Sequence, residues 1–114
     1  MGKQGNMLEQ RLSAFVEAHP GGWSHPEWMG LLGELSRAGV DTSDPVRIGS
    51  ALEKARLMAV LERAGVKGLG PRRREALAER FSRLWDLRQA SVDEIAALPS
   101  MHRGLAEEVH RAVR

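Results

Sequence analysis

Apolar residues recur every three or four positions along most of this chain, and glycine or proline interrupts that spacing at short intervals. Such a period places the apolar side chains on one face of a helix, whereas a half-buried strand would alternate β-branched and polar residues, and no stretch does so. With 114 residues the chain is long enough to bury a core. We therefore expect an all-α protein of about six or seven helices joined by short loops.

The breaks in the apolar spacing indicate where these helices begin. Ser24 with Glu27, and Ser91 with Glu94, have the S-x-x-E spacing of a capping box, in which each residue caps the other's backbone. The expected helices run over residues 7–18, from Ser24 to Gly39, from Ser43 or Asp44 through Pro45 to about Ala64 with an interruption near Gly49, from Pro71 to about Leu84, from Ser91 to Leu98, and on to a last helix ending at Val113.

Charge is distributed unevenly along the chain. Residues 1–65 carry seven Lys and Arg against eight Asp and Glu, whereas residues 66–114 carry ten against seven. Any electrostatic attraction for an acidic partner is therefore expected in the second half. The sequence contains no apolar run of about 20 residues, as a membrane span needs, and its first residues lack the apolar stretch of a secretory signal. We expect a cytoplasmic protein with no membrane partner.

Signals for catalysis are weak. The chain has no cysteine, which excludes disulfides and thiolate zinc sites. The histidines lack the spacing of a zinc-binding helix, and surface or capping positions are expected for His19, His25, His102 and His110. No nucleophile elbow or Walker-type phosphate loop is present. We expect no enzyme activity, cofactor, metal or small-molecule substrate, although an enzyme site in the first half stays a minor alternative.

The stretch "GVKGLGPRRREAL", residues 65–77, has the residue types that an anion site requires. Glycines allow positive φ values and let the backbone approach a phosphate closely. Pro71 suits the first position of a helix, whose N–H groups and dipole favour an anion. Arg72, Arg73 and Arg74 would lie in that first turn, where the dipole disfavours cations unless an anion is bound. The alternative is that the stretch only connects two helices.

The same residues resemble a known DNA-binding element. "VKGLGPRRREALAERF" resembles the helix-hairpin-helix motif, and the following "FSRLWDLRQASVDEIAALPSMHRGLAEEVHRAVR" resembles the connector and second hairpin of the tandem module in the excinuclease C and XPF families. The resemblance implies a tandem, SAM-like module at residues 57–114. It implies backbone binding to duplex or branched DNA without sequence specificity, in DNA repair or recombination. Residues 1–56 resemble nothing known, and we expect this small helical region to pack on the module.

The resemblance assigns the DNA contacts of the first hairpin. Gly68, Leu69 and Gly70, together with Val66, fall on the turn of the motif, and Lys67 stands where proline is common. The amides after Gly70 would bind phosphate. Lys67 and residues 72–74 would supply the charge.

The second hairpin departs from the motif. Pro99, Met101 and Leu105 fit its apolar frame, but Ser100 and His102 stand where the two glycines should be. Because both carry a Cβ, the second turn is expected to lose easy access to positive φ. Two roles stay open for this hairpin, namely side-chain contacts to DNA from Ser100, His102 and Arg103, or a purely structural role.

A protein-interaction module is the main alternative to a DNA-binding one. In this reading the basic turn is vestigial, and a protein partner or a second copy of the chain docks around Trp85, Leu87 and Met101. The three tryptophans, Trp23, Trp28 and Trp85, are expected to be core anchors, with base stacking as the alternative.

Overall fold

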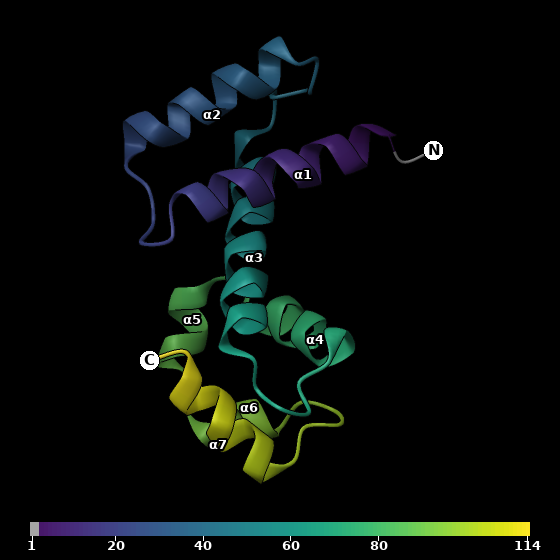
Figure 1. The fold of residues 1–114 in the computed structure, drawn as a ribbon, viewed down its shortest axis with the longest axis vertical. Helices are drawn as coiled ribbons and strands as arrows, with labels where there is room; N and C mark the ends of the chain where they lie inside the picture. Colours follow the sequence, from purple (N-terminus) through teal and green to yellow (C-terminus); the bar gives the residue numbers. More distant parts are fainter. Residues whose placement is uncertain (1–2) are drawn as a thin grey trace. The chain divides into compact units, whose positions relative to one another are not determined.

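The computed structural model describes residues 3–114, with side chains from residue 7 onward, and all regular structure in this range is helical (Figure 1). This confirms the predicted all-α class. The helices are α1 (Lys3–Ala18), α2 (His25–Arg37), α3 (Pro45–Ala64), α4 (Pro71–Phe81), α5 (Leu84–Gln89), α6 (Val92–Ala96) and α7 (Arg103–Ala112). None of the helices so described is long and apolar enough to cross a bilayer.

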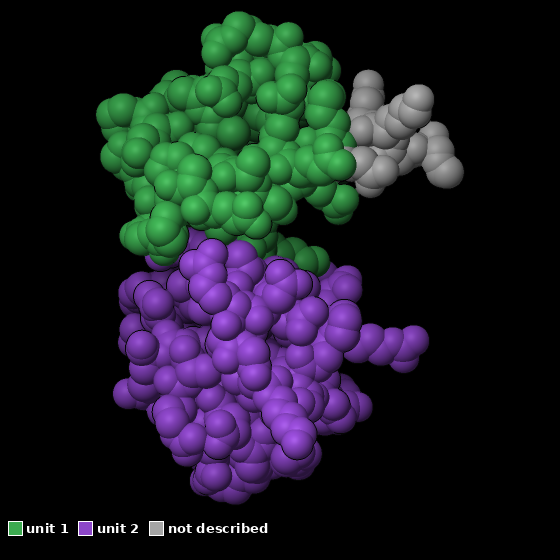
Figure 2. All heavy atoms as spheres, in the orientation of Figure 1, with its two compact units in different colours: residues 1–55 green, residues 56–114 purple. Residues whose placement is uncertain are grey.

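The chain divides into two compact units, unit 1 at residues 1–55 and unit 2 at residues 56–114 (Figure 2). Unit 1 holds α1, α2 and the first part of α3, and α1 lies against α2. The buried apolar side chains of this unit are Leu12, Val16, Leu31, Leu35, Ile48 and Leu52.

Local hydrogen bonds explain where α2 and α3 begin. The predicted capping box of α2 is confirmed: the Glu27 N–H donates to Ser24 Oγ at 3.3 Å, and the Ser24 N–H donates to Glu27 Oε1 at 2.7 Å. The second of these bonds is the main reason why the pKa of Glu27 lies below its ordinary value. At α3, Asp44 is the capping residue of the two candidates, because its Oδ1 accepts the N–H of Arg47 at 3.2 Å.

The prediction of an interruption near Gly49 is wrong, since α3 is continuous from Pro45 to Ala64. A Cβ at Gly49 would lie 3.6 Å from the Trp28 ring, an ordinary van der Waals contact, so the indole of α2 lies beside this turn of α3. The glycine does not break the helix. At the other end of unit 1, α1 begins at Lys3, earlier than residue 7, because the apolar period cannot mark a polar first turn.

Unit 2 has one continuous core that α3, α4, α5, α6 and α7 share. Its buried members are Leu57, Leu61, Leu69, Leu77, Ala78, Phe81, Leu84, Leu87, Ala90, Ile95, Met101, Leu105, Ala106, Val109 and Val113. Within it α6 packs on α7, and α4 packs on α5. The predicted capping box at the start of α6 is confirmed, with Ser91 Oγ accepting the Glu94 N–H at 3.1 Å.

The prediction of a single helix from Pro71 to Leu84 is wrong. Helix α4 ends at Phe81, and α5 begins at Leu84. Ser82 has φ 66° and ψ −41°, and the Arg83 N–H donates across it to the Phe81 carbonyl at 2.7 Å, so a tight turn separates Phe81 and Leu84, which are both buried. No glycine or proline marks this break in the sequence. Core packing of Phe81 and Leu84, and not a local preference of the chain, produces the bend.

The tryptophans differ from the prediction that they anchor the core. Trp85, in the first turn of α5, is 61% exposed, so the prediction is wrong for this residue. Trp23 and Trp28 are partly buried, and the ring of Trp23 meets Phe15 edge-on with 5.4 Å between centroids.

Candidate nucleic-acid interface

Turn 1, residues 65–70, joins α3 to α4 and is held from inside by Leu69. This side chain is 5% exposed, and its N–H donates to the carbonyl of Val66 at 3.1 Å. Gly68 has φ +88°, a conformation that glycine adopts freely, as predicted. Gly70 instead has φ −77° and ψ −179°, which any residue can adopt. The need for glycine at position 70 is therefore not conformational.

Gly70 leaves open space in front of the first turn of α4. A Cβ built on it would meet no other atom within 4 Å. Gly70 is the N-cap residue, no side chain caps the helix, and the first intrahelical bond runs from the Arg74 N–H to the Gly70 carbonyl at 3.0 Å. The N–H groups of Arg72 and Arg73 thus have no intrahelical acceptor, and they point out of the helix end together with its positive dipole. This geometry suits an anion.

The three arginines of α4 differ in their surroundings. Arg73 donates from Nη1 to the Gly68 carbonyl and from Nε to the Ser100 carbonyl, both at 2.8 Å. Arg74 donates from Nη1 to the Leu69 carbonyl at 3.0 Å. These carbonyls carry partial negative charge, and they offset the cost of placing cations at a helix N-terminus.

Lys67 and Arg72 are exposed and flank Gly70 in the sequence. Among the charged side chains predicted to bind phosphate at turn 1, these two present their charge to solvent. The Arg74 side chain is 19% exposed, and its Nη2 lies 3.9 Å from Glu62 Oε2 of α3. The arginine run therefore combines exposed charge with groups that hold the turn in place.

Turn 2, residues 97–102, joins α6 to α7 and matches turn 1 in its last three residues, although Ala97 has φ −70° where Gly65 has φ +61°. Ser100 has φ +65°, at the position that Gly68 takes in turn 1, and His102 is an extended N-cap with φ −86° and ψ 164°, at the position of Gly70. Met101, 6% exposed, is buried like Leu69, and its N–H donates to the Leu98 carbonyl at 3.2 Å.

Turn 2 therefore reaches positive φ without glycine, although Ser100 lacks the easy access to this conformation that glycine has. The burial of Met101 and the bond from its N–H fix the turn, and Ser100 takes a conformation that costs an L-residue about 1–2 kcal/mol. The second hairpin keeps the shape of the motif without its glycines.

The surroundings of the helix start distinguish turn 2 from turn 1. His102 Nδ1 accepts the Leu105 N–H at 3.1 Å, so this ring caps α7, whereas α4 has no such cap. Arg103 pairs with Asp93 at 2.7 Å and with Glu107 at 3.6 Å. The hydrogen bond to Asp93 raises the pKa of Arg103 above its ordinary value. The His102 ring thus covers part of the start of α7, and the charge of Arg103 is already paired with two carboxylates.

Restoring glycine in turn 2 gives a direct comparison of the two hairpins. The double change Ser100→Gly with His102→Gly is expected to strengthen DNA binding several-fold, because it uncaps the Leu105 N–H and opens the start of α7. Fluorescence anisotropy with a labelled duplex measures the effect. The single variant Ser100→Gly is the control, since it relieves φ strain but leaves the cap in place. Unchanged or weaker binding by a folded double variant would contradict the comparison.

The surface expected for a protein partner is not a continuous apolar patch. Leu87 is fully buried and Met101 is 6% exposed, so neither offers much surface to a partner. Trp85 is exposed, and the Arg83 guanidinium lies over its ring at 5.7 Å from the centroid. A docking site would have to centre on this one indole.

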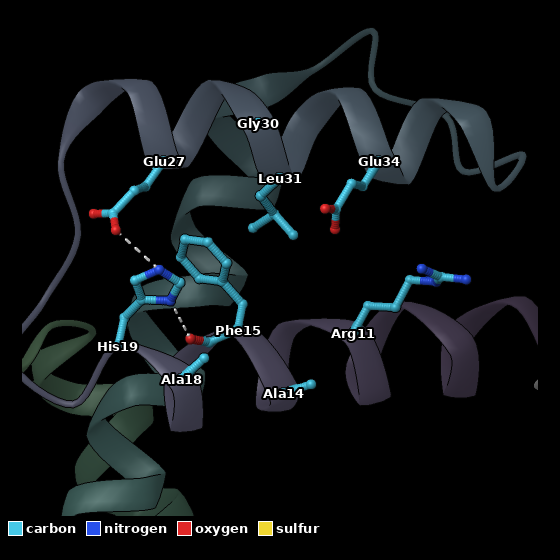
Figure 3. A pocket seen from close by; sticks show the side chains of 9 residues that line it. All are labelled: Arg11, Ala14, Phe15, Ala18, His19, Glu27, Gly30, Leu31 and Glu34. Atoms are coloured by element: carbon cyan, nitrogen blue, oxygen red, sulfur yellow. Dashed lines mark hydrogen bonds and ion pairs between the residues drawn. The ribbon is translucent and has the colours of Figure 1, made fainter.

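Unit 1 contains a pocket of about 430 Å³ between α1 and α2 (Figure 3). His19 spans one end: its Nε2 lies 3.1 Å from Glu27 Oε2, and its Nδ1 lies 2.7 Å from the Phe15 carbonyl. Arg11 and Glu34 line the other end. The sequence did not predict this pocket, because the residues that line it come from two separate helices and only their packing brings these residues together. Among the described residues no group of three or more His, Cys, Asp and Glu could hold a metal ion.

The chain is similar to proteins named UvrABC system protein C. It is 49% identical over 47 residues to the protein of Methanothermobacter thermautotrophicus, 39% identical over 61 residues to that of Vibrio cholerae, and 29% identical over 100 residues to that of Edwardsiella ictaluri. These matches cover 41%, 54% and 88% of this chain but 8%, 10% and 16% of the respective relatives. The chain therefore spans only a small part of the relatives' length.

The matches lie in the C-terminal helix-hairpin-helix region of UvrABC system protein C, which confirms the resemblance predicted from the sequence. The match of 100 residues also extends into residues 1–56, for which the sequence alone suggested no relative. No family model matches the chain, and no solved structure matches it.

Proposed function

We propose that unit 2 binds the phosphate backbone of DNA, without sequence specificity and without catalysis. The observation that carries the proposal is the open N-terminus of α4, where Gly70 leaves free space and no side chain competes for the N–H groups of Arg72 and Arg73. A phosphate oxygen placed there accepts these N–H groups at the positive end of the helix dipole. Contacts of this kind carry no base sequence information, so binding is non-specific.

The exposed charge beside this helix end supports the same proposal. Lys67 and Arg72 are both exposed, and neutralising phosphates by such cations supplies most of the affinity in non-specific binding. The guanidinium groups of Arg73 and Arg74 donate to turn carbonyls, so in this proposal they hold turn 1 in place beside the exposed cations. In this proposal turn 1 makes the main contact with the backbone.

Turn 2 takes a smaller share. The hydroxyl of Ser100, the ring of His102 and the guanidinium of Arg103 are exposed, so we propose them as contacts to a second stretch of backbone. His102 caps α7, however, and Arg103 is paired with two carboxylates, so each would have to exchange an internal partner for a phosphate.

The similarity to UvrABC system protein C supports a place for the chain in nucleotide excision repair. Because the chain corresponds to 8–16% of those relatives, we propose a binding role within a cytoplasmic repair process and assign no strand-cutting step to its residues.

A protein-interaction function is the second candidate, and the exposure of Trp85 favours it. An indole that is 61% exposed is a typical anchor for a protein partner. In this alternative the docking surface is centred on α5, and turn 1 contributes nothing to the affinity.

The role of Arg72 separates the two candidates. Arg72→Ala is expected to weaken binding to duplex, single-stranded and forked DNA alike, by roughly 3- to 10-fold, and to reduce the dependence of log K on log salt by about one unit, as expected for one lost phosphate contact. Arg72→Lys keeps the charge and should bind like the wild type. Arg47→Ala, which removes an exposed cation from unit 1, is the matched control. Equal affinity of Arg72→Ala and the wild type would favour the protein-interaction function.

A further inference from the structure

Arg73 joins two turns that are far apart in the sequence. Its guanidinium donates to the carbonyl of Gly68 in turn 1 and to the carbonyl of Ser100 in turn 2, each at 2.8 Å. These two carbonyls occupy equivalent positions, because each belongs to the residue with positive φ that precedes the buried side chain of its turn. One side chain thus connects the same point of both hairpins.

We infer that Arg73 is a positioning residue, which holds turn 1 and turn 2 in fixed relation so that the start of α4 stays open to phosphate. This inference rests on the proposed DNA binding of unit 2 and gives Arg73 a role different from that of Arg72. The guanidinium directs its Nε and Nη1 hydrogens at turn carbonyls, and its contribution to DNA binding passes through the backbone of Gly68.

An arginine is required for this role. Its planar group carries several N–H donors in a rigid fork, so it reaches two carbonyls in different directions from one place. Lysine has the same charge, but its ammonium is a compact point at the end of a flexible chain and cannot reproduce the fixed fork. A change from arginine to lysine at position 73 therefore removes the connection and keeps the charge.

The lysine variant separates positioning from a direct phosphate contact. Arg73→Lys is expected to lose DNA affinity by about 5-fold or more, as Arg73→Ala does, while both keep a salt dependence close to that of the wild type, because no phosphate contact has been removed. If Arg73 contacts phosphate directly, Arg73→Lys binds like the wild type and Arg73→Ala lowers the salt dependence by about one unit. That result would overturn the inference.

A backbone readout distinguishes positioning from general stability. In amide spectra of the full chain, Arg73→Lys should shift the resonances of Gly68 and Leu69 and also those of Ser100 and Met101, about 27 residues away, as the connection between the turns predicts. Arg72→Lys is the control and should leave turn 2 unchanged. Wild-type DNA affinity of both Arg73→Lys and Arg73→Ala, measured well below their unfolding temperatures, would mean that Arg73 only stabilises the fold.

The outcomes also separate this inference from the proposed function. If Arg72→Ala and Arg73→Lys both bind DNA like the wild type, or if the wild type does not bind, the proposed function fails and the inference fails with it. If Arg72→Ala weakens binding and Arg73→Lys does not, only the inference about Arg73 fails.

Discussion

Replacing Gly70 with aspartate is expected to weaken DNA binding by roughly 30-fold, corresponding to about 2 kcal/mol, while the chain keeps or slightly gains stability. The side chain enters open space and its backbone is already extended, so the fold has room for it. As an N-cap, the carboxylate accepts the N–H groups at the start of α4 and favours the helix dipole, which stabilises the helix by a few tenths of a kcal/mol or more. The same carboxylate occupies and repels the phosphate position.

Opposite changes in stability and binding make this variant informative. Thermal unfolding followed by circular dichroism measures the first, and anisotropy with a labelled duplex measures the second. Gly70→Ser caps the helix without adding charge and should give a smaller loss of affinity. Gly21→Asp adds the same charge in unit 1, where a Cβ also meets no neighbour, and should bind nearly as well as the wild type. A folded Gly70→Asp chain with wild-type affinity would exclude phosphate from the start of α4.

The affinity of the wild-type chain for DNA is expected to fall roughly 100-fold between 50 and 200 mM salt, if about four phosphates are neutralised. Counterions released from the backbone are the physical cause, so the slope counts phosphate contacts and does not depend on base sequence. Anisotropy titrations of two duplexes with unrelated sequences, each at several salt concentrations, measure the slope. Parallel lines of equal affinity are predicted.

An interface that binds through apolar contacts would show a different dependence of affinity on salt. Binding that is insensitive to salt would contradict the phosphate mechanism and would point to contacts such as those that Trp85 offers. A steep slope for one duplex with a much weaker affinity for the other would contradict the absence of sequence specificity.

Local chemistry made much of the fold predictable. The capping boxes at Ser24 and Ser91 form as their spacing predicts, since both partners of each box lie within three residues of one another. The sequence also predicted that glycines of turn 1 give access to positive φ, which Gly68 uses and Gly70 does not. Features that depend on a few neighbouring residues can thus be predicted from the sequence.

Features that depend on tertiary contacts could not be predicted. Ser82 bends the chain so that Phe81 and Leu84 are both buried, although serine gives no local signal for a break. Ser100 takes a positive φ because the burial of Met101 fixes turn 2. In both cases packing overrides a local preference of about 1–3 kcal/mol.

The candidate site was predicted in its location, but the roles of its arginines were not predictable. The run at residues 72–74 reads as one block of charge in the sequence. In the structure Arg72 is exposed, Arg73 connects the two turns and Arg74 holds the Leu69 carbonyl. The partner of Arg73 in turn 2 is about 27 residues away, and no local pattern could have revealed it.

The most direct test of the central claim is to add a short DNA duplex to the full chain and to identify which backbone amide resonances shift. Phosphate at the start of α4 predicts that the largest shifts fall on the amides of Gly70, Arg72 and Arg73, with smaller shifts in turn 2. The proline at position 71 has no amide to report. Shifts concentrated around Trp85, with the amides of turn 1 unchanged, would contradict the account.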